Sequence, residues 1–90
     1  MDSTELQQEL ELANRRIIEI RAQIDRQRKL VLRLETAGHD ATEAKSLLEV
    51  VESVLEAIEN HRERIVEEVS RRTKTALRGG LSETGIGIRR

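Results

Sequence analysis

Apolar residues recur along the first part of the chain with the alternating four- and three-residue spacing of a heptad repeat. The apolar positions of this seam are Leu6, Leu10, Ala13, Ile17, Ile20, Ile24, Val31 and Leu34. Gln27 is the one polar residue among them. Because heptad spacing places side chains on one stripe of a helix, we predict a helix over residues 3–37, roughly 50 Å long. Ser3 or Thr4 is its expected N-cap.

The same spacing resumes after residue 40 and continues to about residue 78. The seam positions of this second stretch are Ala44, Leu48, Val51, Leu55, Ile58, Arg62, Ile65, Val69, Arg72 and Ala76. Leu47, Val50, Val54 and Val66 add apolar side chains beside this seam. A stripe wider than one seam is typical of a helix that faces a larger bundle. We therefore predict a helix over residues 41–78 and a self-association face made of Leu47, Leu48, Val51, Val54, Leu55, Ile58, Ile65, Val66 and Val69.

A short turn separates the two patterns. Gly38 stands where a helix closes with a left-handed residue, and Asp40 begins a D-x-x-E run with Glu43 that is typical of a helix start. His39 lies between them. Because a three-residue connection, 38–40, favours antiparallel neighbours, the sequence predicts a helical hairpin.

The predicted fold class is all-α: an antiparallel, coiled-coil-like two-helix hairpin over residues 1–78 that dimerises into a four-helix bundle. Oligomerisation is the ordinary remedy for so small a core. Gly79-Gly80 is the expected end of the second helix, and residues 79–90 are the expected flexible tail. The alternative for this tail is a docking segment, in which Ile86 and Ile88 enter a partner groove beside Arg89 and Arg90.

Composition and charge exclude some classes of protein but do not identify the function. The chain has 90 residues with no Trp, Tyr, Phe, Pro or Cys, and its formal net charge is -1. This charge hides blocks of about -4, +4, -6 and +5 over residues 1–12, 13–36, 40–68 and 71–90. In an antiparallel hairpin, blocks of opposite charge lie beside each other. Such pairing determines the relative orientation of the two helices more than it adds to the stability of the fold. The acidic N-terminus has no signal-peptide pattern and no apolar run spans a bilayer, so we expect a cytoplasmic protein without a membrane partner.

Candidate chemistry is sparse. His39 and His61 are too far apart to share a metal, and no nucleophile or phosphate-loop motif occurs. We expect no catalytic residue, no metal and no cofactor. Arg16, Gln27, His61 and Arg62 form a candidate polar interface, with Arg62 expected opposite Arg16 and Ile17.

Two resemblances are carried by particular residues. The R-A-Q-I-D run at residues 21–25 loosely resembles the first helix of all-helical chorismate mutases, which implies an enzyme pocket around Arg16, His61 and Arg62. The chain departs from that family because it lacks the helix-ending signals that would divide it into three helices. More specifically, R-R-I, then L-E-T-A-G-H-D-A-T-E-A-K-S-L-L, then H-R-E-R-I resemble a group of small uncharacterised alphaproteobacterial proteins over residues 13–65. That resemblance implies a bacterial cytoplasmic setting and no catalytic residues.

The sequence thus favours a non-enzymatic, self-associating helical scaffold or regulatory protein. Its expected partners are a second copy and an unidentified protein that takes its helical surface. The alternatives are a small regulator that binds nucleic acid through its basic segments and the chorismate-mutase-like enzyme.

Overall fold

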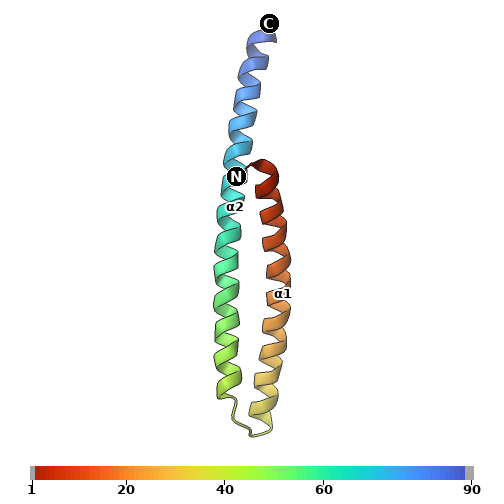
Figure 1. The fold of residues 1–90 in the computed structure, drawn as a ribbon, viewed down its shortest axis with the longest axis vertical. Helices are drawn as coiled ribbons and strands as arrows, with labels where there is room; N and C mark the ends of the chain where they lie inside the picture. The colour runs from red at the N-terminus through yellow and green to blue at the C-terminus, as the bar shows by residue number, and fades with distance from the viewer. Residues whose placement is uncertain (1, 89–90) are drawn as a thin grey trace.

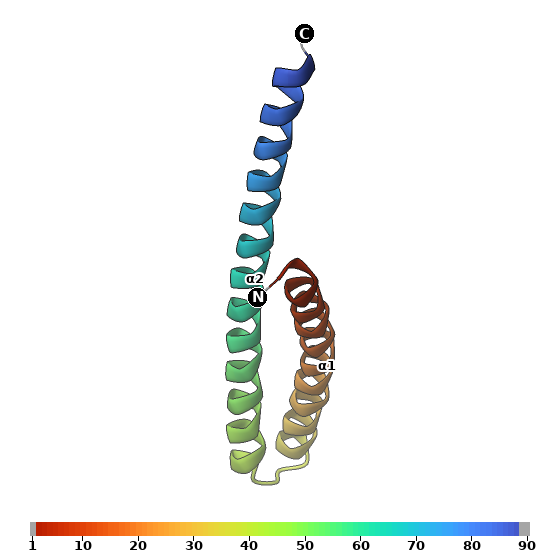
Figure 2. The ribbon, with the colours of Figure 1, turned by 45° about the horizontal axis from the view of Figure 1, so that its top comes forward.

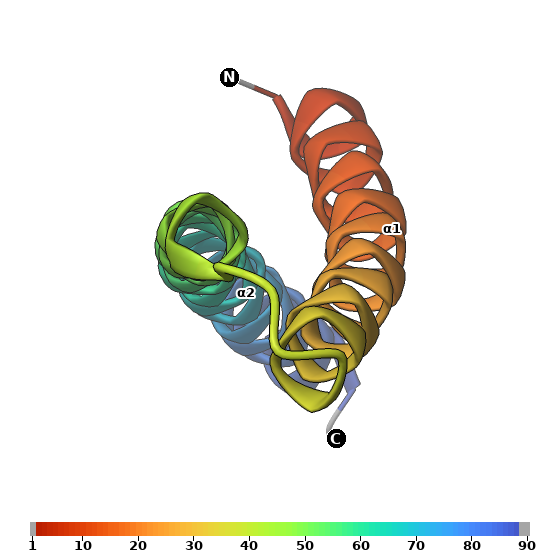
Figure 3. The ribbon, with the colours of Figure 1, turned by 90° about the horizontal axis from the view of Figure 1, so that it is seen from below.

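The protein forms an extended antiparallel hairpin of two helices. The computed structural model describes residues 2–88 and, within them, the side chains of residues 2–77. Helix α1 spans Ser3–Thr36 and α2 spans Thr42–Ile88, and every tertiary contact among the described residues joins the two (Figure 1). The all-α hairpin predicted from the heptad spacing is confirmed. Seen along its length, the two helices are inclined to each other, as heptad-based packing requires (Figure 3).

The start of α1 is a capping box. The Asp2 carboxylate accepts a 2.8 Å hydrogen bond from the Glu5 main-chain N–H, and the Glu5 carboxylate accepts one of 3.3 Å from the Asp2 N–H. This corrects the expected cap at Ser3 or Thr4 by one or two positions. Asp2 has extended backbone angles and Ser3 is already helical, so the first carboxylate of the chain occupies the capping position.

The end of α1 is a Schellman motif that depends on Gly38. The Gly38 N–H donates to the Glu35 carbonyl at 3.1 Å, and the His39 N–H donates to the Leu34 carbonyl at 2.8 Å. Gly38 has φ +77°, the left-handed conformation predicted for it. Ala37 is the C-cap rather than the last helical residue.

The start of α2 differs from the prediction. The Asp40 carboxylate accepts hydrogen bonds from the Thr42 N–H at 2.9 Å and from the Thr42 hydroxyl at 2.6 Å. The Lys45 N–H donates to the Ala41 carbonyl at 2.9 Å, so Ala41 is the residue from which the helix begins. Asp40 therefore forms a tight turn before the helix, and no capping box with Glu43 is formed. The N-cap position is occupied by Ala41, and Asp40 precedes it by one residue, so the Asp40 side chain cannot cap the helix.

The core is a single row of apolar side chains between the helices. Among residues 2–77, the buried side chains are Leu6, Ala13, Ile17, Ile24, Val31, Ala41, Val51 and Ile65. All except Ala41 occupy predicted seam positions. The other apolar seam residues whose side chains are described are half-buried or exposed, because two helices alone cannot enclose both sides of a seam.

Helix α2 extends well beyond the start of α1. The beginning of α1 lies beside Val69, Arg72 and Ala76, and α2 then continues alone to Ile88 (Figures 1 and 2). This corrects the expected helix end at Gly79-Gly80. Gly disfavours a helix by about 1 kcal/mol but does not prohibit one, and no Pro interrupts the segment. Arg89 and Arg90 of the predicted tail lie outside the described residues, and so do the side chains of Ile86 and Ile88.

Candidate functional site

One edge of the hairpin, which we call the polar edge, is crossed by ion pairs at three levels. These pairs are Arg21–Glu59 at 2.8 Å, Arg28–Glu52 at 3.0 Å and Lys45–Glu35 at 2.6 Å. On each helix the participating residues are seven apart, so they share one side of it. The side chains remain substantially exposed, and such pairs contribute about 0–1 kcal/mol each. The polar edge fixes the orientation of the helices more than it stabilises them.

The ion pairs agree with the predicted charge blocks in part. Arg21 and Arg28 come from the basic block of α1 and meet the acidic block of α2. At the other end, Arg72 donates to Glu68 at 2.7 Å within α2, and Arg71 also contacts Glu68. Among the described side chains, neither arginine pairs with the acidic start of α1. The predicted complementarity is therefore found in the middle of the hairpin.

Hydrogen bonds shift three pKa values along the chain. The Thr42 side-chain and main-chain hydrogen bonds lower the pKa of Asp40. Contact with Glu35 raises the pKa of Lys45, and the hydrogen bond from Arg72 lowers the pKa of Glu68. All three shifts favour the charged forms. The cause is a turn hydrogen bond at Asp40 and surface ion pairs at Lys45 and Glu68.

The opposite edge of α2 carries apolar side chains that face solvent. Leu47, Val50 and Val54 are 48%, 58% and 41% exposed, and with Ala57 they form what we call the apolar stripe. Two residues rotate a helix by about 200°, so Val54 lies across the helix from Glu52 of the polar edge. Val50, Val54 and Ala57 line a shallow groove together with Glu49 and Ser53. The apolar stripe is the most continuous unpartnered apolar surface among the described residues.

The structure divides the predicted self-association face into three parts. Val51 and Ile65 are buried against α1, while the side chains of Leu48, Leu55, Ile58 and Val69 are half-buried in the same seam. These six residues hold the hairpin together. Leu47 and Val54 belong to the apolar stripe, whereas Val66 follows Glu59 by seven residues and lies with the polar edge.

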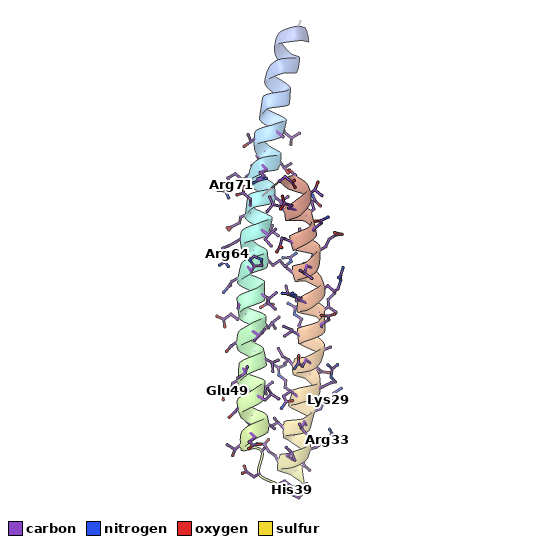
Figure 4. All side chains as sticks on the ribbon, in the orientation of Figure 1. Lys29, Arg33, His39, Glu49, Arg64 and Arg71 are labelled. Atoms are coloured by element: carbon purple, nitrogen blue, oxygen red, sulfur yellow. The ribbon has the colours of Figure 1, made fainter. Side chains whose placement is uncertain are left out.

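The outward side of α1 combines isolated apolar residues with cations. Ile18 and Leu32 are 68% and 64% exposed. Leu32 lies in a shallow groove with Arg26, Lys29 and Arg33, and Lys29 and Arg33 point away from α2 (Figure 4). Single exposed apolar residues of this kind are normal on protein surfaces.

The predicted polar interface is not assembled into one pocket. The Gln27 side-chain N–H donates to the Ala44 carbonyl at 2.9 Å. Arg62 donates to the side-chain oxygen of Asn14, while His61 lies 3.6 Å from the Glu9 carboxylate. Arg16 takes part in no ion pair or hydrogen bond among the described side chains. Arg62 lies in a groove with Ile17, Asn14 and Ile18, so it faces Ile17 as expected but not Arg16.

The predicted turn residues His39 and Glu43 lie at the surface. His39 is exposed at the end of the hairpin (Figure 4), and Glu43 is exposed in the first turn of α2. No group of three or more potential metal ligands occurs among the described residues. Gly38 and Asp40 reverse the chain through the left-handed backbone of Gly38 and the Asp40–Thr42 hydrogen bonds.

Comparisons with family models, curated proteins and solved structures found no match, so function has to be argued from the residues of this chain. Within the described part of the chain, neither helix has an apolar segment long enough to cross a membrane.

Proposed function

We propose that this chain is a non-enzymatic helical interaction module that acts as a homodimer. The single observation that carries the proposal is the apolar stripe. Its side chains are exposed in the isolated hairpin although their spacing continues a heptad pattern. An unpartnered apolar row on a helix is typical of an interface with another helix.

The shape of the hairpin supports the same proposal. Its accessible surface is 6912 Å², whereas a compact protein of 10.3 kDa exposes about 5,400 Å². The difference is on the order of one standard protein interface. Eight buried side chains in one row are a small core, and association with a second copy is the usual way to complete it.

The free energy available from the stripe predicts an interface of modest affinity. Hiding the remaining exposed half of each of Leu47, Val50 and Val54 is worth roughly 1 kcal/mol per side chain. Two copies supply six such side chains, and association costs at least about 4 kcal/mol. The stripe alone therefore leaves roughly 2 kcal/mol, which corresponds to a dissociation constant of about 30 mM. We expect the half-buried seam residues of α2 to join the interface as well, which brings the dissociation constant into the micromolar range.

Sedimentation equilibrium of the wild type and of a Leu47→Glu/Val54→Glu variant tests this proposal. The wild type is expected to reach dimer mass at micromolar concentration, and the variant is expected to stay monomeric while keeping its helical circular dichroism. Ile18→Glu is the matched control, because Ile18 is more exposed than either residue and lies on α1. A wild type that stays monomeric at the highest soluble concentration contradicts the proposal.

A homodimer of this kind presents the remaining helical surface to a further protein partner, which we infer to bind by helix packing. The polar edge would set the orientation of the bound partner, because charged pairs discriminate between partners more than they add affinity.

The second candidate function is nucleic-acid binding through the outward side of α1. Arg15, Arg26 and Arg33 are exposed there and form no ion pair among the described side chains. Phosphate contacts from such cations give salt-dependent affinity without sequence preference. Retention of duplex DNA or RNA at low salt that an Arg26→Ala/Arg33→Ala variant loses supports this function. Equal retention by both proteins, or none, rejects it.

A further inference from the structure

The apolar stripe is part of a second heptad seam whose charges are ordered. Along the helix the residues at three- and four-residue steps are Glu43, Leu47, Val50, Val54, Ala57, His61 and Arg64. The four apolar positions are thus preceded by an acidic residue on the side of the turn. They are followed by a histidine and an arginine on the C-terminal side. Asp40 adds a second acid just before the helix begins. If a second copy of the helix runs in the opposite direction, its basic end lies beside the acidic end of the first copy.

We propose that the partner of this seam is a second copy of the chain, bound through α2 in antiparallel orientation about a twofold axis near residue 52. This inference rests on the proposed homodimer and specifies its geometry. The twofold axis places Val50 against Val54 of the other copy and Leu47 against Ala57. Glu43 then meets His61, and Arg64 reaches Asp40. Each contact occurs twice, as an isologous interface requires.

The charges favour this orientation over the others. In a parallel pairing of the two α2 helices, Glu43 meets Glu43 and Arg64 meets Arg64, so like charges face each other at both ends. In the antiparallel pairing Arg64 of one copy meets the opposite charge of Asp40 of the other, once at each end. Arg64 points away from α1 (Figure 4), and its side chain is exposed, so it is accessible to the second copy. His61 also lies 3.6 Å from Glu9 of its own hairpin, so Glu9 and Glu43 of the second copy compete for the same imidazole.

A self-complementary seam also argues for a second copy rather than an unrelated helix. A surface selected to bind a different protein has no reason to match its own reversed charge order. Here the match extends over 25 positions, from Asp40 to Arg64, with residue 52 at its centre. The polar edge is left on the outside of this dimer, where its ion pairs stay solvated.

The antiparallel dimer has a distinctive length. The axis near residue 52 is only about 12 residues from the turn but 36 residues from Ile88, so the far ends of the two hairpins project in opposite directions. At ~1.5 Å per residue, the dimer is roughly 110 Å long. The isolated hairpin is 77 Å long, and two hairpins stacked in register keep that length.

Charge reversal tests the orientation. Glu43→Arg alone and His61→Glu alone are each expected to raise the dimer dissociation constant about tenfold, and the double variant is expected to restore it, because position 43 of one copy meets position 61 of the other. Glu67→Arg and Arg15→Glu introduce the same charged side chains at exposed positions off the seam and are expected to leave the dissociation constant within about twofold. Because Glu43→Arg also removes an acid from the first turn of α2, restoration in the double variant shows that the defect is at the interface.

A cysteine test uses the absence of native thiols. Under mild oxidation Val50→Cys/Val54→Cys is expected to form a covalent dimer, whereas Val50→Cys alone is not, because Val50 faces Val54 rather than itself. Small-angle scattering of the covalent dimer is expected to give a maximum dimension near 110 Å.

The outcomes separate the two proposals. A monomeric wild type removes both the homodimer and its geometry. A dimer of about 77 Å, an unimpaired Glu43→Arg variant or a Val50→Cys disulfide overturns the antiparallel seam and leaves the homodimer standing.

Discussion

Gln27 of α1 donates a 2.9 Å hydrogen bond from its side-chain amide to the main-chain carbonyl of Ala44 in α2. Gln27 is the one polar residue in the seam of the first helix, and this bond couples it to the beginning of the second. A polar residue at a seam position fixes the register of two helices at some cost in stability. The bond is therefore a direct marker of the observed alignment.

Replacing Gln27 by Ala is expected to lower the free energy of unfolding by about 1 kcal/mol, since it removes one hydrogen bond and part of the packing. Urea denaturation followed by circular dichroism measures this loss. Gln8→Ala, at an exposed position of the same helix, serves as the control and is expected to change stability by less than about 0.5 kcal/mol. Equal effects at the two positions contradict the register role.

Gly38→Ala is expected to destabilise the hairpin by about 1–2 kcal/mol, because Gly38 has φ +77° and an L-residue is strained there. An added Cβ meets no atom within 4 Å, so the cost is one of backbone conformation alone. Gly38→Asn is expected to lose less, since Asn tolerates the left-handed region. Thermal melts that rank Ala as the milder change refute this explanation.

The Asp40 turn predicts a pH dependence. Hydrogen bonds from Thr42 lower the pKa of Asp40 below its ordinary value of 3.8. The stability that the charged carboxylate contributes is therefore present above that value and is lost as the pH falls through the lowered pKa. Asp40→Asn keeps an acceptor without the charge, so the difference in melting temperature between wild type and variant is expected to shrink below about pH 4. A difference that is unchanged from neutral pH to about pH 2 contradicts this origin.

The polar edge makes a prediction about salt. A double-mutant cycle on Arg28→Ala and Glu52→Ala is expected to give a coupling free energy below about 1 kcal/mol, because both side chains are exposed. The coupling is expected to become smaller still at about 1 M NaCl, where charges are screened over about 3 Å. A larger, salt-independent value means that the pair is more strongly shielded from solvent than its exposure indicates.

Heptad spacing and Gly38 were sufficient to predict the two helices, their antiparallel pairing and most of the core. Local caps were harder to place. Asp2 and Ser3 are both good N-caps, and only the backbone angles distinguish them. Asp40 and Glu43 have capping-box spacing, yet Asp40 bonds Thr42 two residues on, which is the competing turn chemistry of the same side chain. Gly79-Gly80 has helix-ending composition, but with no Pro the structure continues the helix through it.

The surface was predicted less well because sequence spacing alone does not say which side of a wide apolar stripe meets the first helix. Val51 and Val54 are three residues apart and equally apolar, but one is buried against α1 and the other is 41% exposed. Arg62 and His61 are adjacent, yet they contact Asn14 and Glu9 separately. A one-residue difference on a helix rotates a side chain by about 100°, which is enough to separate a core residue from a surface one.

The placement of all tertiary contacts between two helices joined at one short turn has a consequence for folding. Contacts near Gly38 close small loops, whereas those between Leu6 and Ala76 close a loop of nearly the whole chain. Loop-closure entropy therefore favours zipping of the hairpin outward from the turn, and the end near Asp2 is the last to form and the first to fray. Amide hydrogens are then expected to exchange most slowly in the parts of both helices that lie closest to the turn. Protection from exchange is expected to fall progressively toward the start of α1.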